Sequence, residues 1–341
     1  MKSVVIACAF MLSLVIVSDR ADGQTTTDEC ARTAVQKVEG PGVWQPGPEG
    51  RQLPLWPDGR TIQLPETGGL PEYTGNGSPL VAGRLWNWAT YVARPTMTVY
   101  QPKTANSGAA LVVLPGGGYA AVAMDLEGTE ICDWITKQGV TCVLLKYRVP
   151  QVWPRDTRGV SHAPAEQLPL QDAQRAIGLL RHRASAFGLD PRKIGVIGFS
   201  AGGHLAASVS NTEQRTYEGT DAADRESSLP NFAILLYPGR LWDSRSGEAG
   251  LHVASWVKIS RKAPPTLLIH AMNDPVDDVR HSTAYGLSLH DAGVLVDMRF
   301  YAKGCHAFGL RPTSDPITTE WPGVVVTWLR NLGMLVKSDR R

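Results

Sequence analysis

The sequence lacks a strong excess of charge of either sign. Lys and Arg total 34 and Asp and Glu total 32 of 341 residues, so the formal net charge at pH 7 is only +2. The longest basic stretch is the C-terminal tail, residues 337–341. Proteins that bind nucleic acid or an anionic membrane surface through charge carry a basic patch or stripe. We therefore expect neither nucleic acid nor a membrane surface as a partner.

A hydrophobic run long enough to span a membrane is also lacking. The first apolar run, residues 4–17, covers 14 residues, which is too short for a comfortable membrane span. Lys2 precedes this run, and the small residues Ala21 and Gly23 follow it at the positions that signal cleavage requires. We interpret residues 1–23 as a secretory signal peptide and expect export to the periplasm or beyond, without stable membrane insertion. The alternative is an uncleaved N-terminal anchor.

Cysteine is scarce, with five residues in the chain. Cys8 falls in the signal peptide, and the mature chain keeps Cys30, Cys132, Cys142 and Cys305. No Cys-x-x-Cys motif or Cys/His cluster has the spacing of a zinc site, so we expect no bound metal. Export permits disulfides, and four cysteines allow three complete pairings, among which the sequence does not choose.

Helical periodicity is missing from residues 24–95, which are rich in proline, glycine and tryptophan. The stretches GPGVWQPGPEG and LPETGGLPEYTGNGSP show no apolar residue at helical spacing. We predict an extended, irregular N-terminal segment that wraps around the following domain, residues 96–336. The chain contains no internal repeat.

From residue 96 onward, apolar runs alternate with helical stretches. The runs AALVVLPGGGY, VTCVLLKYR, KIGVIGF, NFAILLYPG and PTLLIHAMND are typical of buried parallel strands. Stretches such as LPLQDAQRAIGLLRHRASAFG carry apolar residues at helical spacing. This alternation predicts an α/β fold with a doubly wound, mostly parallel sheet and helices on both faces. The loops at residues 211–229 and 240–263 are too short for a large cap domain.

The stretch GFSAG, residues 198–202, follows one of these strands and begins an alanine-rich helix. Glycines two residues before and after Ser200 allow the strand and the helix to approach closely while the serine is held in a strained turn. This arrangement makes Ser200 a candidate nucleophile. The alternative is that the Ser200 hydroxyl only caps the helix.

A serine nucleophile needs a base to remove its proton and an acid to orient that base. Asp274 lies just past the strand in PTLLIHAMND, and His306 follows the next strand in the loop KGCHAFG. Because parallel strands end at the same edge of a sheet, we expect both side chains near Ser200. Asp277 and Asp278 are rivals for the acid, and Asp274 could instead only form a turn. The remaining histidines of the mature chain are interpreted as packed or solvated rings.

The glycine-rich loop LPGGGYAA follows the first strong strand. The amides of Gly117 and Gly118, together with the Ala201 amide at the helix start, are candidate donors to an oxyanion. The same loop also fits a dinucleotide-binding fingerprint. That fingerprint requires an acidic residue near the end of the next strand, where this chain has Lys146. We therefore expect no nucleotide cofactor.

These blocks, taken in order, resemble the α/β-hydrolase superfamily and, more narrowly, bacterial esterases related to acetyl xylan esterases and bifunctional feruloyl/acetyl xylan esterases. The likeness covers residues 50–335 and is carried by LPLWPDG, LPGGGY, LLKYRVP, DPRKIGVIGFSAGGHLAAS, HAMNDPVDD and FYAKGCHAFGLR. It implies a triad of Ser200, Asp274 and His306, oxyanion donors at Gly117, Gly118 and Ala201, and no metal or organic cofactor.

Two loops depart from the pattern that is usual in these relatives. The histidine loop reads GCHAFG where GGHGFG is common. The acid loop has Asp277 and Asp278 where an apolar residue and a proline are common. Neither change removes a catalytic group, and both bear on substrate preference.

The resemblance and the signal peptide together predict a secreted serine carboxylesterase that hydrolyses short acyl esters, with acetyl groups on xylan or a related polysaccharide as the substrate. One alternative is a peptidase of the prolyl-oligopeptidase type, which usually carries a large propeller ahead of this domain. Another is a non-catalytic carbohydrate-binding protein on a hydrolase scaffold.

The N-terminal segment contains several tryptophans: Trp44, Trp56, Trp86 and Trp88. They either stack on sugars or, as we favour, pin the segment to the core.

Overall fold

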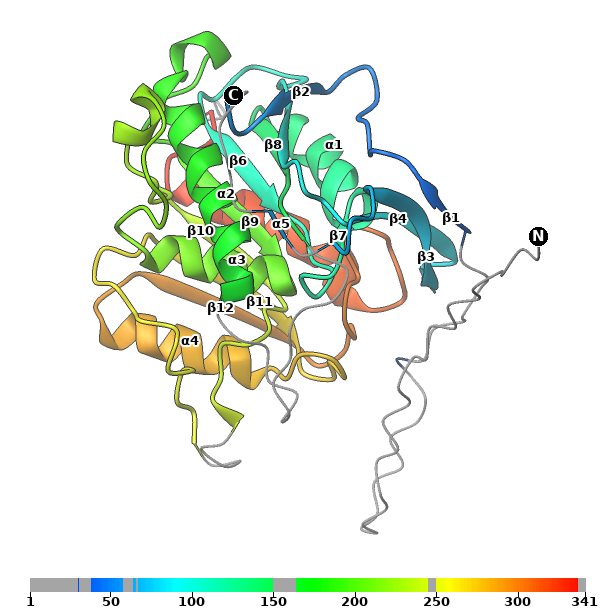
Figure 1. Ribbon diagram of the computed structural model, residues 1–341. Helices are drawn as coiled ribbons and strands as arrows, with labels where there is room; N and C mark the ends of the chain where they lie inside the picture. Colours follow the sequence, from blue (N-terminus) through cyan, green and yellow to red (C-terminus); the bar gives the residue numbers. More distant parts are fainter. Residues whose placement is uncertain are drawn as a thin grey trace, which may run out of the picture.

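The computed structural model describes Cys30 and residues 38–57, 64–65, 67–149, 164–244 and 250–336 (Figure 1). The predicted signal peptide, residues 1–23, lies outside these ranges. In the part of the chain that the structure describes, no helix combines the length and the hydrophobicity that a membrane crossing requires.

Eight strands form the central sheet. In spatial order they are β12 (Val296–Tyr301), β11 (Thr266–Ala271), β10 (Ala233–Leu236), β9 (Ile194–Phe199), β6 (Ala110–Leu114), β8 (Thr141–Lys146), β5 (Thr96–Tyr100) and β2 (Arg51–Pro54). The strands from β12 to β8 pair in parallel, whereas β5 and β2 at the other edge pair antiparallel. This order confirms the mostly parallel, doubly wound sheet that the alternating pattern predicts.

The five central strands are buried along their whole length. Continuous burial on both faces explains why these strands occur in the sequence as unbroken apolar runs. On the edge strand β12, by contrast, exposed positions alternate with half-buried ones over most of its length.

Helices cover both faces of the sheet (Figure 1). Their bounds are α1 Glu130–Thr136, α2 Pro164–His182, α3 Ala201–Asn211, α4 Arg280–Asp291 and α5 Pro316–Asn331, with short helical turns at Asp125–Thr129, Ser185–Phe187 and Ala222–Arg225. On one face α3 packs against α2, and the Asn211 side chain donates a hydrogen bond to Tyr285 of α4. On the other face Trp134 of α1 meets Trp321 of α5, with ring centroids 5.2 Å apart.

The N-terminal segment is less irregular than its sequence suggests. Besides β2, it contributes three strands to a small antiparallel sheet, which β7 from the following domain completes: β1 (Val38–Pro41), β3 (Tyr73–Val81), β4 (Arg84–Thr90) and β7 (Val122–Ala123). The prediction of an irregular segment is therefore wrong for these residues. Strands β3 and β4 form a hairpin around Ala82 and Gly83, both at positive φ. Glycine and proline break the apolar alternation that would have revealed them.

A buried cluster joins this segment to the main sheet. We call Trp56, Arg148, Asp172 and Arg175 the arginine cluster. Arg148 forms an ion pair with Asp172 at 2.8 Å, and the Trp56 indole N–H donates to the same carboxylate at 2.9 Å. The guanidinium of Arg175 lies 5.7 Å from the centre of the Trp56 ring. Trp56 therefore pins the segment to the core, as we favoured for the tryptophans. The described residues of LPLWPDG and LLKYRVP meet LPLQDAQR here.

Candidate active site

Ser200 lies on a sharp turn between β9 and α3. Its backbone has φ 52° and ψ −118°, a region that L-residues rarely adopt, and its side chain makes no capping hydrogen bond to the helix. The strand and the helix approach so closely that a Cβ on Gly198 would lie 2.1 Å from the carbonyl oxygen of Gly202. Likewise, a Cβ on Gly202 would lie 1.9 Å from the carbonyl oxygen of Leu114. The two flanking glycines of GFSAG therefore permit the turn, and the hydroxyl is presented at the sheet edge.

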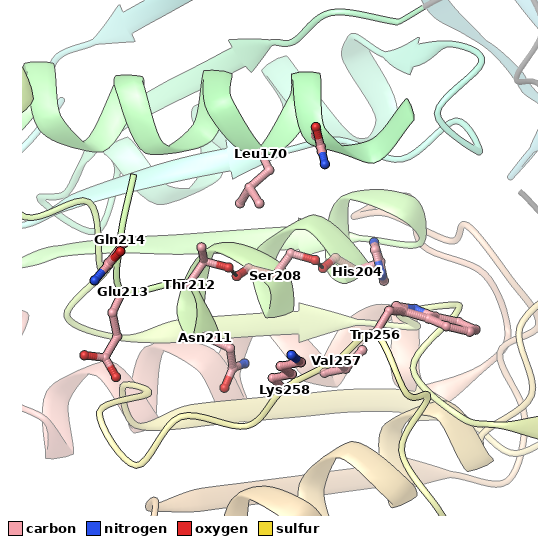
Figure 2. Close-up of a pocket in the computed structure, with 11 residues that line it drawn as sticks. Leu170, His204, Ser208, Asn211, Thr212, Glu213, Gln214, Trp256, Val257 and Lys258 are labelled. Atoms are coloured by element: carbon pink, nitrogen blue, oxygen red, sulfur yellow. Dashed lines mark hydrogen bonds between the residues drawn. The ribbon is translucent and has the colours of Figure 1, made fainter. Parts of the chain in front are cut away.

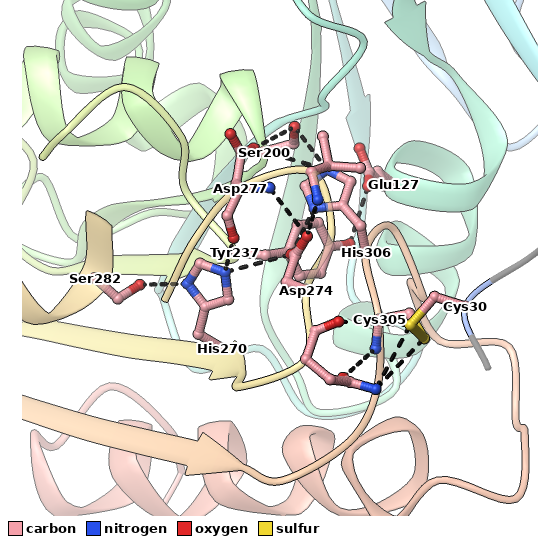
Figure 3. A network of polar contacts seen from close by, with 12 residues as sticks. Cys30, Glu127, Ser200, Tyr237, His270, Asp274, Asp277, Ser282, Cys305 and His306 are labelled. Atoms are coloured by element: carbon pink, nitrogen blue, oxygen red, sulfur yellow. Dashed lines mark hydrogen bonds and ion pairs between the residues drawn. A yellow bond between two sulfur atoms is a disulfide. The ribbon is translucent and has the colours of Figure 1, made fainter. Parts of the chain in front are cut away.

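The structure brings Asp274 and His306 to this serine (Figure 3). His306 Nε2 lies 3.0 Å from Ser200 Oγ, and His306 Nδ1 lies 2.7 Å from Asp274 Oδ2. The three residues follow the carboxyl ends of β9, β11 and β12, the edge where the sequence places them. Their order and contacts are those of a nucleophile, a base and an acid that orients the base.

Asp274 is held as an anion. Its side chain is fully buried, which opposes ionisation, but hydrogen bonds with His270 and His306 outweigh burial and hold the pKa of Asp274 well below its usual range. The backbone N–H groups of Val276 and Asp277 also donate to its second oxygen at 2.8 and 3.0 Å. The Asp274 carboxylate can therefore accept a hydrogen bond from the His306 Nδ1–H group and stabilise a positive charge on the imidazole ring.

His306 is surrounded by acidic groups. Burial lowers the pKa of the imidazole, but the hydrogen bond to Asp274 and the charges of Asp274, Asp277 and Glu127 together raise it above its usual value. The ring packs edge to face on Tyr237, with centroids 4.9 Å apart. A base with a raised pKa that is fixed by packing and by Asp274 is suited to accept the serine proton.

Two of the three oxyanion candidates border a cavity of about 360 Å³ next to Ser200. Gly117 and Gly118 line this cavity together with Ser200 and His306, and Ala201 begins α3 beside them. The amide of the preceding residue, Gly116, is already used, because it donates to Glu127 at 2.7 Å.

Glu127 is a site residue that the sequence did not reveal. Its side chain is buried, lines the cavity and accepts hydrogen bonds from the Gly116 amide and from the Tyr237 hydroxyl at 2.9 Å. It thus ties the glycine loop to the residue on which His306 packs. In the sequence, Glu127 stands in the polar stretch DLEGTE, which has the composition of a solvated helix start.

His270 is the second residue that the sequence did not reveal. We interpreted it as one of the packed rings, and it is indeed fully buried on β11. Its Nε2 lies 3.3 Å from Asp274 Oδ2, and its Nδ1 lies 2.8 Å from Ser282 Oγ (Figure 3). Asp274 therefore lies between two imidazoles. The only signal in the sequence is that His270 lies four residues before the acid.

The cysteines pair as Cys30–Cys305 and Cys132–Cys142. Cys305 directly precedes His306, so the first disulfide fastens the histidine loop to the N-terminal segment. Asn273, next to Asp274, accepts a hydrogen bond from the Cys305 amide at 3.0 Å. Cys30 and Trp86 both line the catalytic cavity, so the N-terminal segment forms part of its wall.

The two rival acids take different positions. Asp277 Oδ2 lies 3.4 Å from Ser200 Oγ and 3.8 Å from His306 Nε2, whereas Asp278 pairs with Arg280 at 3.0 Å. Neither contacts the Nδ1 atom that an orienting acid must hold. His204, on α3, is buried and shares a hydrogen bond of 2.7 Å with the Tyr119 hydroxyl, in keeping with a packed ring.

A larger cleft of about 530 Å³ runs along α3 (Figure 2). Its lining comes from α2, α3 and the 256–258 loop, and includes Leu170, His204, Ser208, Asn211 and Trp256. It contains none of Ser200, Asp274 and His306. Over the described ranges, no group of three or more His, Cys, Asp or Glu side chains is arranged to hold a metal ion.

Comparisons with known proteins find esterases among the relatives of this chain. The family model described as BD-FAE matches residues 97–235. The chain is 28% identical to an acetylxylan esterase of Xylanibacter ruminicola over 222 residues, which cover 60% of this chain and 42% of that protein. It is 26% identical to an ethyl acetate hydrolase of Pseudomonas putida over 238 residues, which cover 61% of this chain and 68% of that protein. The alignment therefore spans less than half of the acetylxylan esterase.

Solved structures show the same fold. The acetyl ester-xyloside bifunctional hydrolase from Caldicellulosiruptor lactoaceticus superposes with a TM-score of 0.64 at 26% identity, covering 85% of this chain and 98% of that one. An esterase from Thermogutta terrifontis gives a TM-score of 0.57 at 20% identity, covering 72% and 92%. These matches confirm the resemblance that the motifs indicate: the chain has an α/β-hydrolase fold, and its residues 97–235 match the BD-FAE model.

Proposed function

We propose that the protein is an exported serine carboxylesterase that removes acetyl groups from xylan or a related polysaccharide. The observation that carries the proposal is the chain of contacts from Ser200 Oγ through His306 to Asp274, at 3.0 and 2.7 Å. The similarity to an acetylxylan esterase and to an acetyl ester-xyloside hydrolase supports the choice of acetyl esters on a carbohydrate.

The reaction proceeds through an acyl-enzyme. Ser200 Oγ attacks the ester carbonyl carbon while its proton passes to His306 Nε2, and Asp274 stabilises the resulting imidazolium. The bond from carbon to the alcohol oxygen then breaks, and His306 gives its proton to the departing alcohol. Water loses a proton to His306 as it attacks the acyl group, and the proton returns to Ser200 Oγ as acetate leaves.

Oxyanion stabilisation is assigned to the amides of Gly117, Gly118 and Ala201. Glu127 supports this assignment, because it occupies the Gly116 amide and so holds the glycine loop in one position. Amide donors that are already aimed at the developing oxyanion need no rearrangement during the reaction. Removing one such donor typically costs about 10²–10³ in kcat.

Export is part of the proposal and rests on residues 1–23, which the structure does not describe. The two disulfides support it, because disulfides persist in oxidising compartments. A direct test is to express the full chain and sequence the N-terminus of the exported protein. Residue 24 at the N-terminus supports cleavage after Gly23, whereas an intact residue 1 would favour an anchored protein.

The test of the activity is acetate release from acetylated xylan by the purified mature protein. Ser200→Ala should reduce the rate by about 10³-fold or more, because only oxyanion stabilisation and binding remain. Ser208→Ala is the matched control. It removes a hydroxyl from α3, the helix that Ser200 precedes, and this hydroxyl donates a hydrogen bond to the His204 carbonyl at 2.9 Å.

Labelling of Ser200 by a fluorophosphonate separates a catalytic from a non-catalytic protein. Labelling without acetate release would support a serine hydrolase mechanism but contradict a carbohydrate acetyl ester as the substrate. Turnover by Ser200→Ala close to that of the wild type would reject the mechanism.

A further inference from the structure

The catalytic serine lies beside a second acidic side chain that the triad does not use. Asp277 Oδ2 is 3.4 Å from Ser200 Oγ and 3.8 Å from His306 Nε2. Ser200 has one hydroxyl proton, and His306 is the closer acceptor at 3.0 Å. The Asp277 carboxylate therefore lies at the reacting atoms with its hydrogen-bonding capacity largely unused.

Asp277 borders the position of the leaving alcohol, not that of the acyl group. In serine hydrolysis the base returns its proton from Nε2 to the departing alcohol, so a group near both Nε2 and Oγ is close to that oxygen. Glu127, in contrast, lines the cavity that contains Gly117 and Gly118, whereas Asp277 does not. Figure 3 shows Asp277 and Glu127 on opposite sides of the Ser200–His306 pair.

The position of Asp277 is built into the fold. Its amide donates to Asp274 at 3.0 Å, and its carbonyl oxygen lies 2.9 Å from His270 Nε2. A Cβ on Gly239 would lie 2.3 Å from Asp277 Oδ1, so only glycine there leaves room for the carboxylate. The side chain is 18% exposed, which lets a substrate reach it.

The charged surroundings favour a strong acceptor. Burial raises the pKa of Asp277, and the Asp274 charge adds to this effect, while His306 and His270 oppose it. A carboxylate with a raised pKa is more basic and accepts hydrogen bonds more strongly. Over the described residues, the ion-pair contact of Asp277 is with His306. A neutral hydrogen-bond donor on the substrate can therefore approach without displacing a lysine or arginine.

We propose that Asp277 accepts a hydrogen bond from a hydroxyl adjacent to the ester in the leaving alcohol, so that the site selects esters of vicinal diols. Such a hydroxyl is present wherever a sugar ring is acetylated at one of two neighbouring positions. This inference rests on the proposed esterase function and narrows its substrate class. A simple alkyl ester would instead bring no hydrogen-bond donor to this mostly buried carboxylate, which costs binding energy in the transition state.

The test compares two acetates that differ in one donor. Ethylene glycol monoacetate carries the adjacent hydroxyl, and 2-methoxyethyl acetate replaces its hydrogen by methyl while keeping a similar electron-withdrawing oxygen. We expect the wild type to prefer the glycol ester by about ten-fold or more in kcat/KM, the size of a hydrogen bond to a charged acceptor. A ratio measured on one preparation is independent of the fraction of active enzyme.

Variants of the acid loop assign the preference to one side chain. Asp277→Ala should bring the ratio close to one, and Asp277→Asn, which keeps one neutral acceptor oxygen, should give an intermediate ratio. Asp278→Asn is the matched control, because its carboxylate pairs with Arg280 at 3.0 Å. It should keep the wild-type ratio.

Each outcome decides the proposal. A wild-type ratio near one overturns it without any variant, and so does a ratio that Asp277→Ala leaves unchanged. If Asp277→Ala does not fold, the isosteric Asp277→Asn and the wild-type ratio decide. Hydrolysis of both acetates with an unchanged ratio would leave the esterase function standing, whereas no hydrolysis of either by the wild type would overturn both.

Discussion

We call the sheet edge that carries Ser200, Asp274 and His306 the catalytic edge. The catalytic edge and the arginine cluster each contain a buried aspartate that is held by other side chains, and these partners differ in kind. Asp172 is bound by the Arg148 guanidinium and the Trp56 indole, groups that stay protonated at any physiological pH. Asp274 is bound by two imidazoles, His270 and His306, and the ring of His306 can gain or lose a proton. The first arrangement fixes structure, whereas the second can move a proton.

The N-terminal segment takes part in both places. Trp56 anchors it at the arginine cluster, and Cys30 fastens it to the residue before His306. If the arginine cluster has only a structural role, substitutions there should lower the free energy of unfolding and leave kcat/KM of the folded enzyme unchanged. Substitutions at the catalytic edge should do the opposite.

The largest effect is expected for Asp274→Asn. The amide keeps the shape but offers an N–H or a neutral oxygen where His306 needs an anion, so the ring is held in the wrong tautomer and the imidazolium loses its stabilisation. We expect kcat to fall by about 10³–10⁴-fold, as for the loss of the triad acid in other serine hydrolases. The measurement is kcat on an acetyl ester beside a thermal unfolding curve, and a rate within ten-fold of the wild type would contradict the assignment.

Asp172→Ala should change stability instead. It removes one partner of a buried ion pair and leaves the Arg148 guanidinium uncompensated, which typically lowers the free energy of unfolding by about 3–5 kcal/mol. Denaturant unfolding measures this loss, and kcat/KM per folded molecule should remain near that of the wild type.

A control for this prediction exists on the surface. Asp190 pairs with Arg192, whose side chain is 85% exposed, and Asp190→Ala should cost at most about 1 kcal/mol. An equal loss in both variants would show that burial does not distinguish the two pairs.

The parts of the site that local sequence determines could be predicted. Ser200 was recognisable because the strand, the flanking glycines and the helix start are contiguous. Asp274 and His306 were recognisable because each follows an apolar strand, and parallel strands bring their carboxyl ends together. Asp277 ranked behind Asp274 because it lies three residues further from the strand end. In the structure its carboxylate contacts Ser200 Oγ and His306 Nε2, whereas Asp274 contacts His306 Nδ1.

The parts that depend on packing could not be predicted. Glu127 acts through contacts with Gly116 and Tyr237, residues far apart in sequence, and nothing in DLEGTE distinguishes it from a surface acid. His270 lies within an apolar strand. From the sequence alone, a histidine at such a position cannot be distinguished from an ordinary packed ring. The cysteine pairing depends on which cysteines the fold brings together, Cys30 with Cys305 and Cys132 with Cys142. Glycine and proline hide the strands of the N-terminal segment in the sequence.

A smaller effect is expected for loss of the disulfide at the catalytic edge. Replacing Cys30 and Cys305 together by alanine frees the histidine loop from the N-terminal segment. We expect a loss of stability of about 2–4 kcal/mol. We also expect about a ten-fold lower kcat/KM, because a loosened His306 is less often in position.

The second disulfide, Cys132–Cys142, serves as the control for this prediction. Cys132 and Cys142 are buried away from the catalytic cavity, so the double alanine variant there should lower stability without a specific loss of rate. An equal drop in kcat/KM per folded molecule for both double variants would show that the histidine loop does not depend on its link to Cys30.

The smallest expected effect is a displacement of the pH profile. The neutral form of His306 is the base, so kcat/KM rises as pH increases through the pKa of its imidazole. The anions Asp274, Asp277 and Glu127 raise that pKa, and the acid limb therefore lies above the ordinary range of histidine. Asp277→Asn removes one of these anions, lowers the pKa of His306 and moves the acid limb to lower pH.

Asp172→Asn is the control. It removes an anion from the arginine cluster instead and should leave the acid limb of the pH profile unchanged. If the acid limb moves in both variants, or in neither, the prediction is wrong. The charges at the catalytic edge would then have no effect on the pKa of His306 that differs from the effect of charges at the arginine cluster.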